Sequence, residues 1–176
     1  MDKQTEEILQ KIEEAEYVLV GLGQEFDMEF FLQSREDYRR IREQLQQQNV
    51  LWLLPYVEEQ FRRQYLPEME AEIEKGLQKL AKVLEKKSYF VVSSSLNHKL
   101  AEVPWKKMLL KKERFVAPCG DWTKKQCPDG CEEGIQTVTE ADEEQLQESF
   151  KKLQTNGFSV PNLGKCPKCG KKLVLN

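Results

Sequence analysis

The sequence has a single histidine, His98, among 176 residues, and this scarcity excludes several kinds of chemistry. A zinc protease of the HExxH type needs two histidines on one helix face, and a catalytic triad or a Cys–His pair could use only His98. Long hydrophobic runs are absent too, because no stretch approaches the roughly 18 apolar residues of a membrane span. The acidic N-terminus lacks the apolar core of a secretion signal. We therefore expect a cytoplasmic protein without membrane contact.

An excess of positive charge is also missing. The chain carries 27 Lys and Arg against 30 Asp and Glu, which gives a formal net charge of −3. Nucleic-acid binding needs a basic surplus that contacts phosphates, so we do not expect it here. Hydrophobic residues make up 39% of the chain, well above the composition of a disordered protein.

Hydrophobic periodicity predicts an α/β fold. Residues 3–15 have the apolar spacing of an amphipathic helix, and the apolar run 17–21 predicts a buried parallel strand. Residues 34–86 predict a helical insertion, after which 88–95 and 114–117 predict two more strands. The pattern indicates a partial Rossmann-like parallel sheet flanked by helices.

The composition changes after residue 118. Residues 1–118 hold the predicted sheet and its helices, whereas residues 119–176 are rich in Cys, Gly, Pro and Lys. One helix is predicted there, over 140–154, with Thr139 and Asp142 spaced as a capping box. We expect the second segment to form a small zinc-ribbon module.

Four of the five cysteines form two pairs with metal-ligand spacing. Cys127 and Cys131 lie in a Cys-Pro-Asp-Gly-Cys turn, and Cys166 and Cys169 lie in a Cys-Pro-Lys-Cys-Gly turn. Two such turns together make a tetrahedral thiolate site, which suits Zn²⁺. Four protein ligands leave no open position, so the zinc is expected to be structural. The neighbouring lysines, Lys168 and Lys171 among them, are expected to offset the thiolate charge.

Candidate ligand-binding residues follow the predicted strands. Gly21 and Gly23 come directly after the first strand, where glycines permit a tight turn and a close approach to a ligand. Ser95, Asn97 and His98 come after the second strand. Ligands of open α/β sheets bind beyond the carboxyl ends of the strands, so both stretches are placed where a site would lie.

Cys119 is left over from the ligand count and follows the third predicted strand. It is either a buried small residue or a reactive thiol, and the neighbouring Asp121 would raise a thiol pKa and oppose its activation.

Taken in order, five stretches resemble the sirtuins, most closely the macrodomain-linked bacterial and fungal class. The stretches are AEYVLVGLG, YFVVSSSLNH, FVAPCGDW, CPDGC and CPKCG. The resemblance implies a Rossmann-like NAD domain with a zinc module, and transfer of ADP-ribose to a protein or deacylation of lysine. It implies NAD contacts at Gly21, Gly23, Ser95 and Asn97. It implies a catalytic role for Cys119, Asn97 and His98.

The sequence departs from the sirtuin pattern at three motifs. The glycine turn continues as Gln24–Asp27, where the family has small residues, and its acidic side chains would repel a pyrophosphate. Asn97 stands where the family has an aspartate, and Cys119 stands at the position of the catalytic His or Gln. The family also continues into further Rossmann strands after its second Cys pair, whereas seven residues follow Cys169 in this sequence.

Three functions are therefore open on the sequence. The first is a non-catalytic sirtuin-like module that binds a protein partner or itself, to which Trp105 and Trp122 could contribute. The second is an NAD-dependent ADP-ribosyltransferase or deacylase. The third is a zinc-ribbon interaction protein unrelated to NAD.

Overall fold

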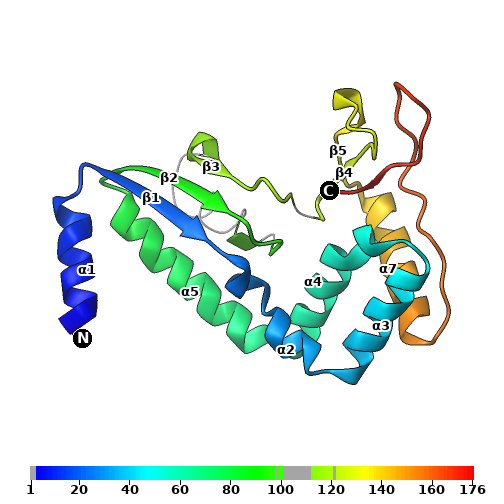
Figure 1. The fold of residues 1–176 in the computed structure, drawn as a ribbon, viewed down its shortest axis with the longest axis horizontal. Coiled ribbons are helices and arrows are strands. Elements are labelled where there is room, and N and C mark those ends of the chain that lie inside the picture. The colour runs from blue at the N-terminus through cyan, green and yellow to red at the C-terminus, as the bar shows by residue number, and fades with distance from the viewer. Residues whose placement is uncertain (1–2, 98, 101–111, 121) are drawn as a thin grey trace.

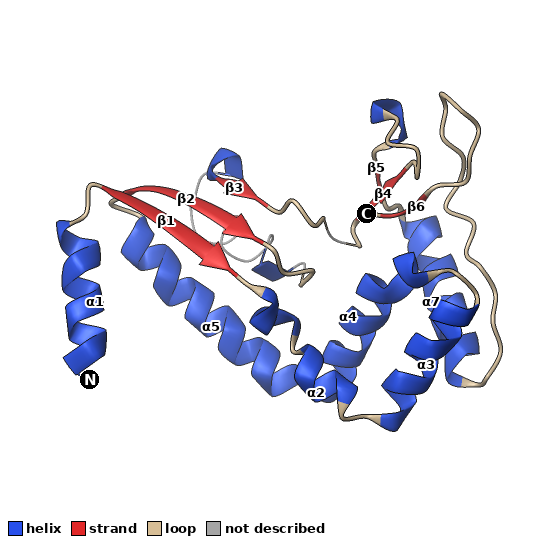
Figure 2. Ribbon diagram, in the orientation of Figure 1, coloured by secondary structure: helices blue, strands red, loops and turns tan. Residues whose placement is uncertain are grey.

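The computed structural model describes residues 3–97, 99–100, 112–120 and 122–176, and it has a mixed α/β fold (Figures 1 and 2). The helices are α1 (Lys3–Glu14), α2 (Glu29–Gln33), α3 (Glu36–Gln47), α4 (Leu54–Tyr65), α5 (Pro67–Leu84) and α7 (Glu140–Gln154). The strands are β1 (Tyr17–Leu22), β2 (Ser88–Ser93), β3 (Phe115–Val116), β4 (Lys124–Gln126), β5 (Gln136–Thr137) and β6 (Val174–Leu175).

The first sheet is parallel, as the sequence predicts, with the order β1-β2-β3. Leu22 at the end of β1 lies opposite Ser93 at the end of β2. The carboxyl ends of both strands therefore meet at the same edge of the sheet, and the loops that follow them lie side by side.

The two faces of this sheet differ in burial. Helix α5 packs on one face, where its buried Leu77, Ala81 and Leu84 share a core with strand residues such as Val91. The prediction that strand 17–21 is buried is wrong for the other face, because Tyr17 is 74% and Leu19 is 76% exposed. A continuous apolar run cannot by itself reveal how many layers cover a strand.

A second core joins the helices to the cysteine-rich segment. Leu45 of α3, Phe61 of α4 and Phe150 of α7 belong to one buried cluster with Cys127 and Cys166. The rings of Phe61 and Phe150 meet edge to face, with centroids 5.9 Å apart. Helices α3 and α4 thus support the cysteine-rich segment, whereas α5 supports the parallel sheet.

Helix α7 begins and ends where the sequence predicts. The Thr139 side chain accepts a hydrogen bond from the Asp142 backbone, and the Asp142 side chain accepts one from the Thr139 backbone, so the predicted capping box is present. Across the described residues, no helix combines the length and the apolar character needed to cross a membrane.

Candidate functional site

The loops after β1 and β2 are joined by one carboxylate, that of Asp27. Oδ1 of Asp27 accepts hydrogen bonds from the backbone N–H of Leu96 at 2.8 Å and of Asn97 at 3.1 Å, and a third from the Ser95 hydroxyl. Asp27 itself is buried. The N–H groups that a ligand could use beyond the end of β2 are therefore taken by a side chain of the protein.

The side chain of Asn97 is also committed within the fold. Its Nδ2 donates to the Phe26 carbonyl at 3.1 Å and to Glu70 Oε1 at 3.2 Å, and its Oδ1 accepts from the Lys99 N–H at 3.1 Å. Asn97 is buried. It therefore connects the loop after β1 with helix α5 and does not point to solvent.

The glycine turn is closed by its own chain as well. Glu25 Oε1 accepts the Gly23 N–H at 3.2 Å, and the Glu25 carboxylate lies where a Cβ at position 23 would stand. A side chain at position 23 would have to displace only this exposed, flexible carboxylate, so the contact does not by itself require glycine. The same contact removes the N–H that would make the turn a phosphate cradle.

A buried ion cluster adjoins Asp27. Arg62 of α4 is fully buried, lies 3.2 Å from Glu59 and 3.5 Å from Glu70, and donates to the Asp27 carbonyl at 3.3 Å. Glu58 lies 3.9 Å from Arg62 and accepts the Tyr38 hydroxyl at 2.7 Å. Sequence patterns did not reveal this cluster, since charged residues of an amphipathic helix ordinarily face water.

Burial governs the ionisation of two of these carboxyl groups. Burial raises the pKa of Asp27 above its ordinary value, although the Ser95 hydrogen bond and the Arg62 charge oppose that rise. Burial also raises the pKa of Glu58, against the effects of Tyr38 and Arg62. Both groups are therefore harder to ionise in the folded protein than in the unfolded chain.

The structure brings together four of the residues that the sequence singles out near the sheet: Gly21, Gly23, Ser95 and Asn97. Cys119 is exposed in a turn and forms no hydrogen bond or ion pair with them among the described residues. His98, Trp105 and Asp121 lie outside the described residues. Trp122 is buried and packs edge to face on Tyr56 with centroids 5.3 Å apart, so it is not available to a partner, contrary to expectation.

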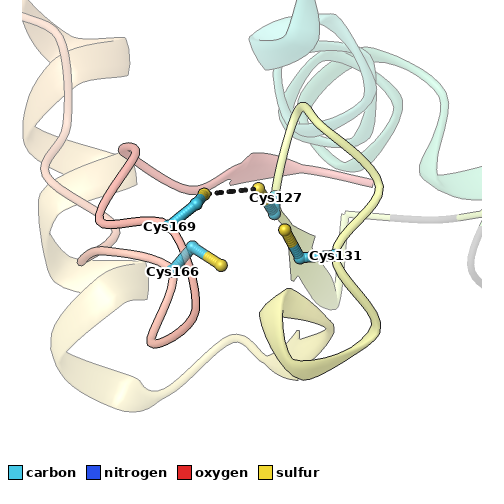
Figure 3. A group of neighbouring side chains, drawn as sticks. All are labelled: Cys127, Cys131, Cys166 and Cys169. Atoms are coloured by element: carbon cyan, nitrogen blue, oxygen red, sulfur yellow. Dashed lines mark hydrogen bonds between the residues drawn. The ribbon is translucent and has the colours of Figure 1, made fainter.

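The four paired cysteines gather at one point, as Figure 3 shows. The sulfur atoms of Cys127, Cys131, Cys166 and Cys169 all lie within 4.8 Å of one another, and those of Cys127 and Cys169 are 3.4 Å apart. A tetrahedron with metal–sulfur bonds of about 2.3 Å has edges of about 3.8 Å. The cluster can therefore hold a metal ion.

Glycines shape the two cysteine turns. Gly130 and Gly170 have φ values of +70° and +74°, a left-handed conformation that glycine adopts without strain. The Gly130 N–H donates to the Cys127 carbonyl at 3.0 Å, and the Gly170 N–H donates to the Cys166 carbonyl at 2.9 Å. Strand β4, which leads into the first turn, pairs with β6, which follows the second. This pairing brings together cysteines that are far apart in the sequence.

The charges around the sulfur cluster are mixed. Two of the lysines expected to offset the thiolates pair with carboxylates instead, Lys171 with Asp129 at 2.7 Å and Lys168 with Glu133 at 3.5 Å. Burial disfavours the Cys127 thiolate, but hydrogen bonds from the Asp129 backbone and from Cys169 outweigh it and lower the pKa of Cys127 to about 7. Burial raises the pKa of Cys131 to about 12.

No model of a known protein family matches the chain, and no curated protein matches it.

Proposed function

We propose that the chain is a sirtuin-like module without NAD chemistry, which binds a protein partner and is stabilised by a structural zinc ion. The observation that carries this proposal is the commitment of Asp27 to the N–H groups of Leu96 and Asn97. A dinucleotide bound at this edge of the sheet would need those donors, and its phosphates would face the carboxylates of Asp27 and Glu25.

The zinc part of the proposal rests on the four sulfur atoms. Their mutual distances suit tetrahedral coordination, and four thiolates are typical of structural rather than catalytic zinc. Bound zinc would join the turn after β4 to the turn before β6. Because Cys127 and Cys166 belong to the core shared with α3 and α4, the metal would also stabilise that core.

The protein-binding part rests on the uncovered face of the parallel sheet. Parallel sheets are ordinarily covered on both faces, yet the side chains of Tyr17 and Leu19 are largely exposed here. Contiguous exposed apolar side chains on a folded protein are typical of interaction surfaces.

Titration of NAD into the zinc-loaded protein by calorimetry tests the proposal. We expect no heat of binding, together with no release of nicotinamide from NAD. Binding with a micromolar dissociation constant would overturn the proposal and favour an NAD-dependent transferase or deacylase. In that case a Cys119→Ala variant would show whether nicotinamide release depends on this thiol.

A further inference from the structure

A second apolar surface lies beside the carboxyl end of β1, where Leu22 meets helix α5. It is a cavity of about 770 Å³ between helix α5 and the segment that follows β1. Its described walls include Met28 and Phe31 on one side and Met69, Ile73 and Leu80 of α5 on the other. The exposed Phe30 packs edge to face on Phe31, with centroids 5.8 Å apart, and extends the apolar surface outward.

Helix α5 leaves part of its apolar surface open to the cavity. Leu77, Ala81 and Leu84 are buried against the sheet, whereas Ile73 and Leu80 are only partly buried beside the same core and line the cavity with Met69. The lining residues of α5 run from Glu68 to Leu80, a length of about 18 Å at 1.5 Å per residue. This length matches about three turns of a second helix lying along α5.

Gly76 stands in the middle of this lining and is not explained by the fold. A glycine inside a helix costs about 1 kcal/mol relative to alanine. A Cβ at position 76 would meet no heavy atom within 4 Å, so close packing within the chain does not require glycine there. The missing side chain leaves room above α5, so another backbone can approach the helix closely there.

The charged side chains on the described walls all have the same sign. Glu25, Glu68 and Glu72 line the cavity, and no described Lys or Arg does. Glu72 is paired with Lys75 at 2.6 Å, but neither Glu25 nor Glu68 forms an ion pair with another described residue. An apolar occupant with basic residues at its edges would complement this groove.

We propose that the groove between α5 and the segment after β1 binds an amphipathic helix of a partner protein, with Lys or Arg flanking its apolar face. This inference rests on the proposed function, since it identifies where a protein-binding module would hold its partner. The partner's apolar side chains would enter between Phe31 and Ile73, and its backbone would approach α5 at Gly76.

The probe is a displayed library of helical peptides of about 12 to 16 residues, long enough for the groove. Their apolar positions are kept at every third or fourth residue, and Lys, Glu, Gln and Ser vary at the others. We expect selection on the zinc-loaded protein to enrich Lys over Glu. The selected peptides should bind the Gly76→Leu variant at least about tenfold more weakly, and the Glu25→Gln/Glu68→Gln variant should also weaken binding.

Ala71→Leu is the matched control, because Ala71 is exposed on the same helix and does not line the groove. It should leave peptide binding unchanged. The inference is overturned if no peptide is enriched or if Gly76→Leu leaves peptide binding unchanged. It is also overturned if Ala71→Leu weakens peptide binding as much as Gly76→Leu does. It is also overturned if light scattering shows a dimer that Gly76→Leu dissociates, or if a hydrophobic amine binds where no peptide does. A flat NAD titration with no enriched peptide would reject this groove while leaving the proposed function standing.

Discussion

Asn97 and Asp27 hold two loops together that are 70 residues apart in the sequence: the Asn97 N–H donates to the Asp27 carboxylate at 3.1 Å. The Asn97 side chain adds a bond to the carbonyl of Phe26, at 3.1 Å. The loops that follow β1 and β2 are thereby joined by hydrogen bonds within the chain, and the first prediction tests this connection.

Replacing Asp27 by alanine should destabilise the protein by about 3 kcal/mol, because the Ser95 hydroxyl and the Leu96 N–H would lose their acceptor and the Asn97 N–H would keep only the Ser95 hydroxyl. Asp27→Asn keeps one acceptor oxygen and should cost less. Urea unfolding of the zinc-loaded protein measures both. Glu36→Gln, an exposed change on α3, is the control and should stay within about 0.5 kcal/mol of wild type. An alanine variant as stable as this control would contradict the bonding described for Asp27.

Glu58→Gln should gain stability relative to wild type as the pH rises. Burial raises the pKa of Glu58 above its ordinary 4.5. At pH values between 4.5 and this raised pKa, the folded state therefore binds more protons than the unfolded state. The carboxyl of wild type therefore costs stability once the pH exceeds about 4.5, while glutamine still accepts the Tyr38 hydroxyl. Unfolding free energies of both proteins at several pH values test this.

The exposed Glu43→Gln substitution on α3 is the matched control for loss of a carboxylate in that experiment. If the difference in unfolding free energy between wild type and Glu58→Gln were the same at all pH values, burial would not shift the pKa of Glu58.

Cys131→Ser should abolish zinc binding, because one of four thiolate ligands would be lost. Atomic emission should show about one zinc per chain for wild type and almost none for the variant. Near-ultraviolet circular dichroism should report loosening of the core that Cys127 and Cys166 share with Phe150. Cys119→Ser is the control, since this exposed thiol lies outside the cluster, and it should retain its zinc. Equal zinc contents of the two variants would reject the site.

Lys125→Met should destabilise the protein by about 3 kcal/mol at neutral pH, because it leaves a buried carboxylate without its cation. Lys125 lies 2.7 Å from Asp142, and both side chains are 8% exposed. Burial opposes ionisation of Asp142, but Lys125 and Thr139 outweigh it and lower the pKa of Asp142 below its ordinary 3.8. The pair therefore contributes stability above pH 3.8 that is lost as the pH falls below that value.

Thermal unfolding at neutral pH checks this effect, and Lys124→Met is its control, because Lys124 is exposed on the same strand. Similar losses of thermal stability in Lys125→Met and Lys124→Met would mean that the buried ion pair contributes nothing to stability.

Local patterns predicted the elements that depend on near neighbours along the chain. Hydrophobic spacing predicted α1, the parallel strands β1 and β2 and the helix α7 with its capping box, because helix period, strand period and caps are set by residues a few positions apart. Cysteine spacing likewise predicted which sulfur atoms would meet, since each pair lies on one tight turn.

The tertiary structure alone decided which of the polar residues face solvent and which face one another. Asn97 was expected at a ligand site after the second strand, and Asp27 in a turn that would repel a pyrophosphate. Packing of α4 and α5 instead buries both residues, against Glu70 and Arg62 respectively. The same packing leaves Tyr17 and Leu19 exposed and opens a groove above Gly76. Burial depends on contacts between segments far apart in the sequence, and such contacts leave no periodic signal in either segment.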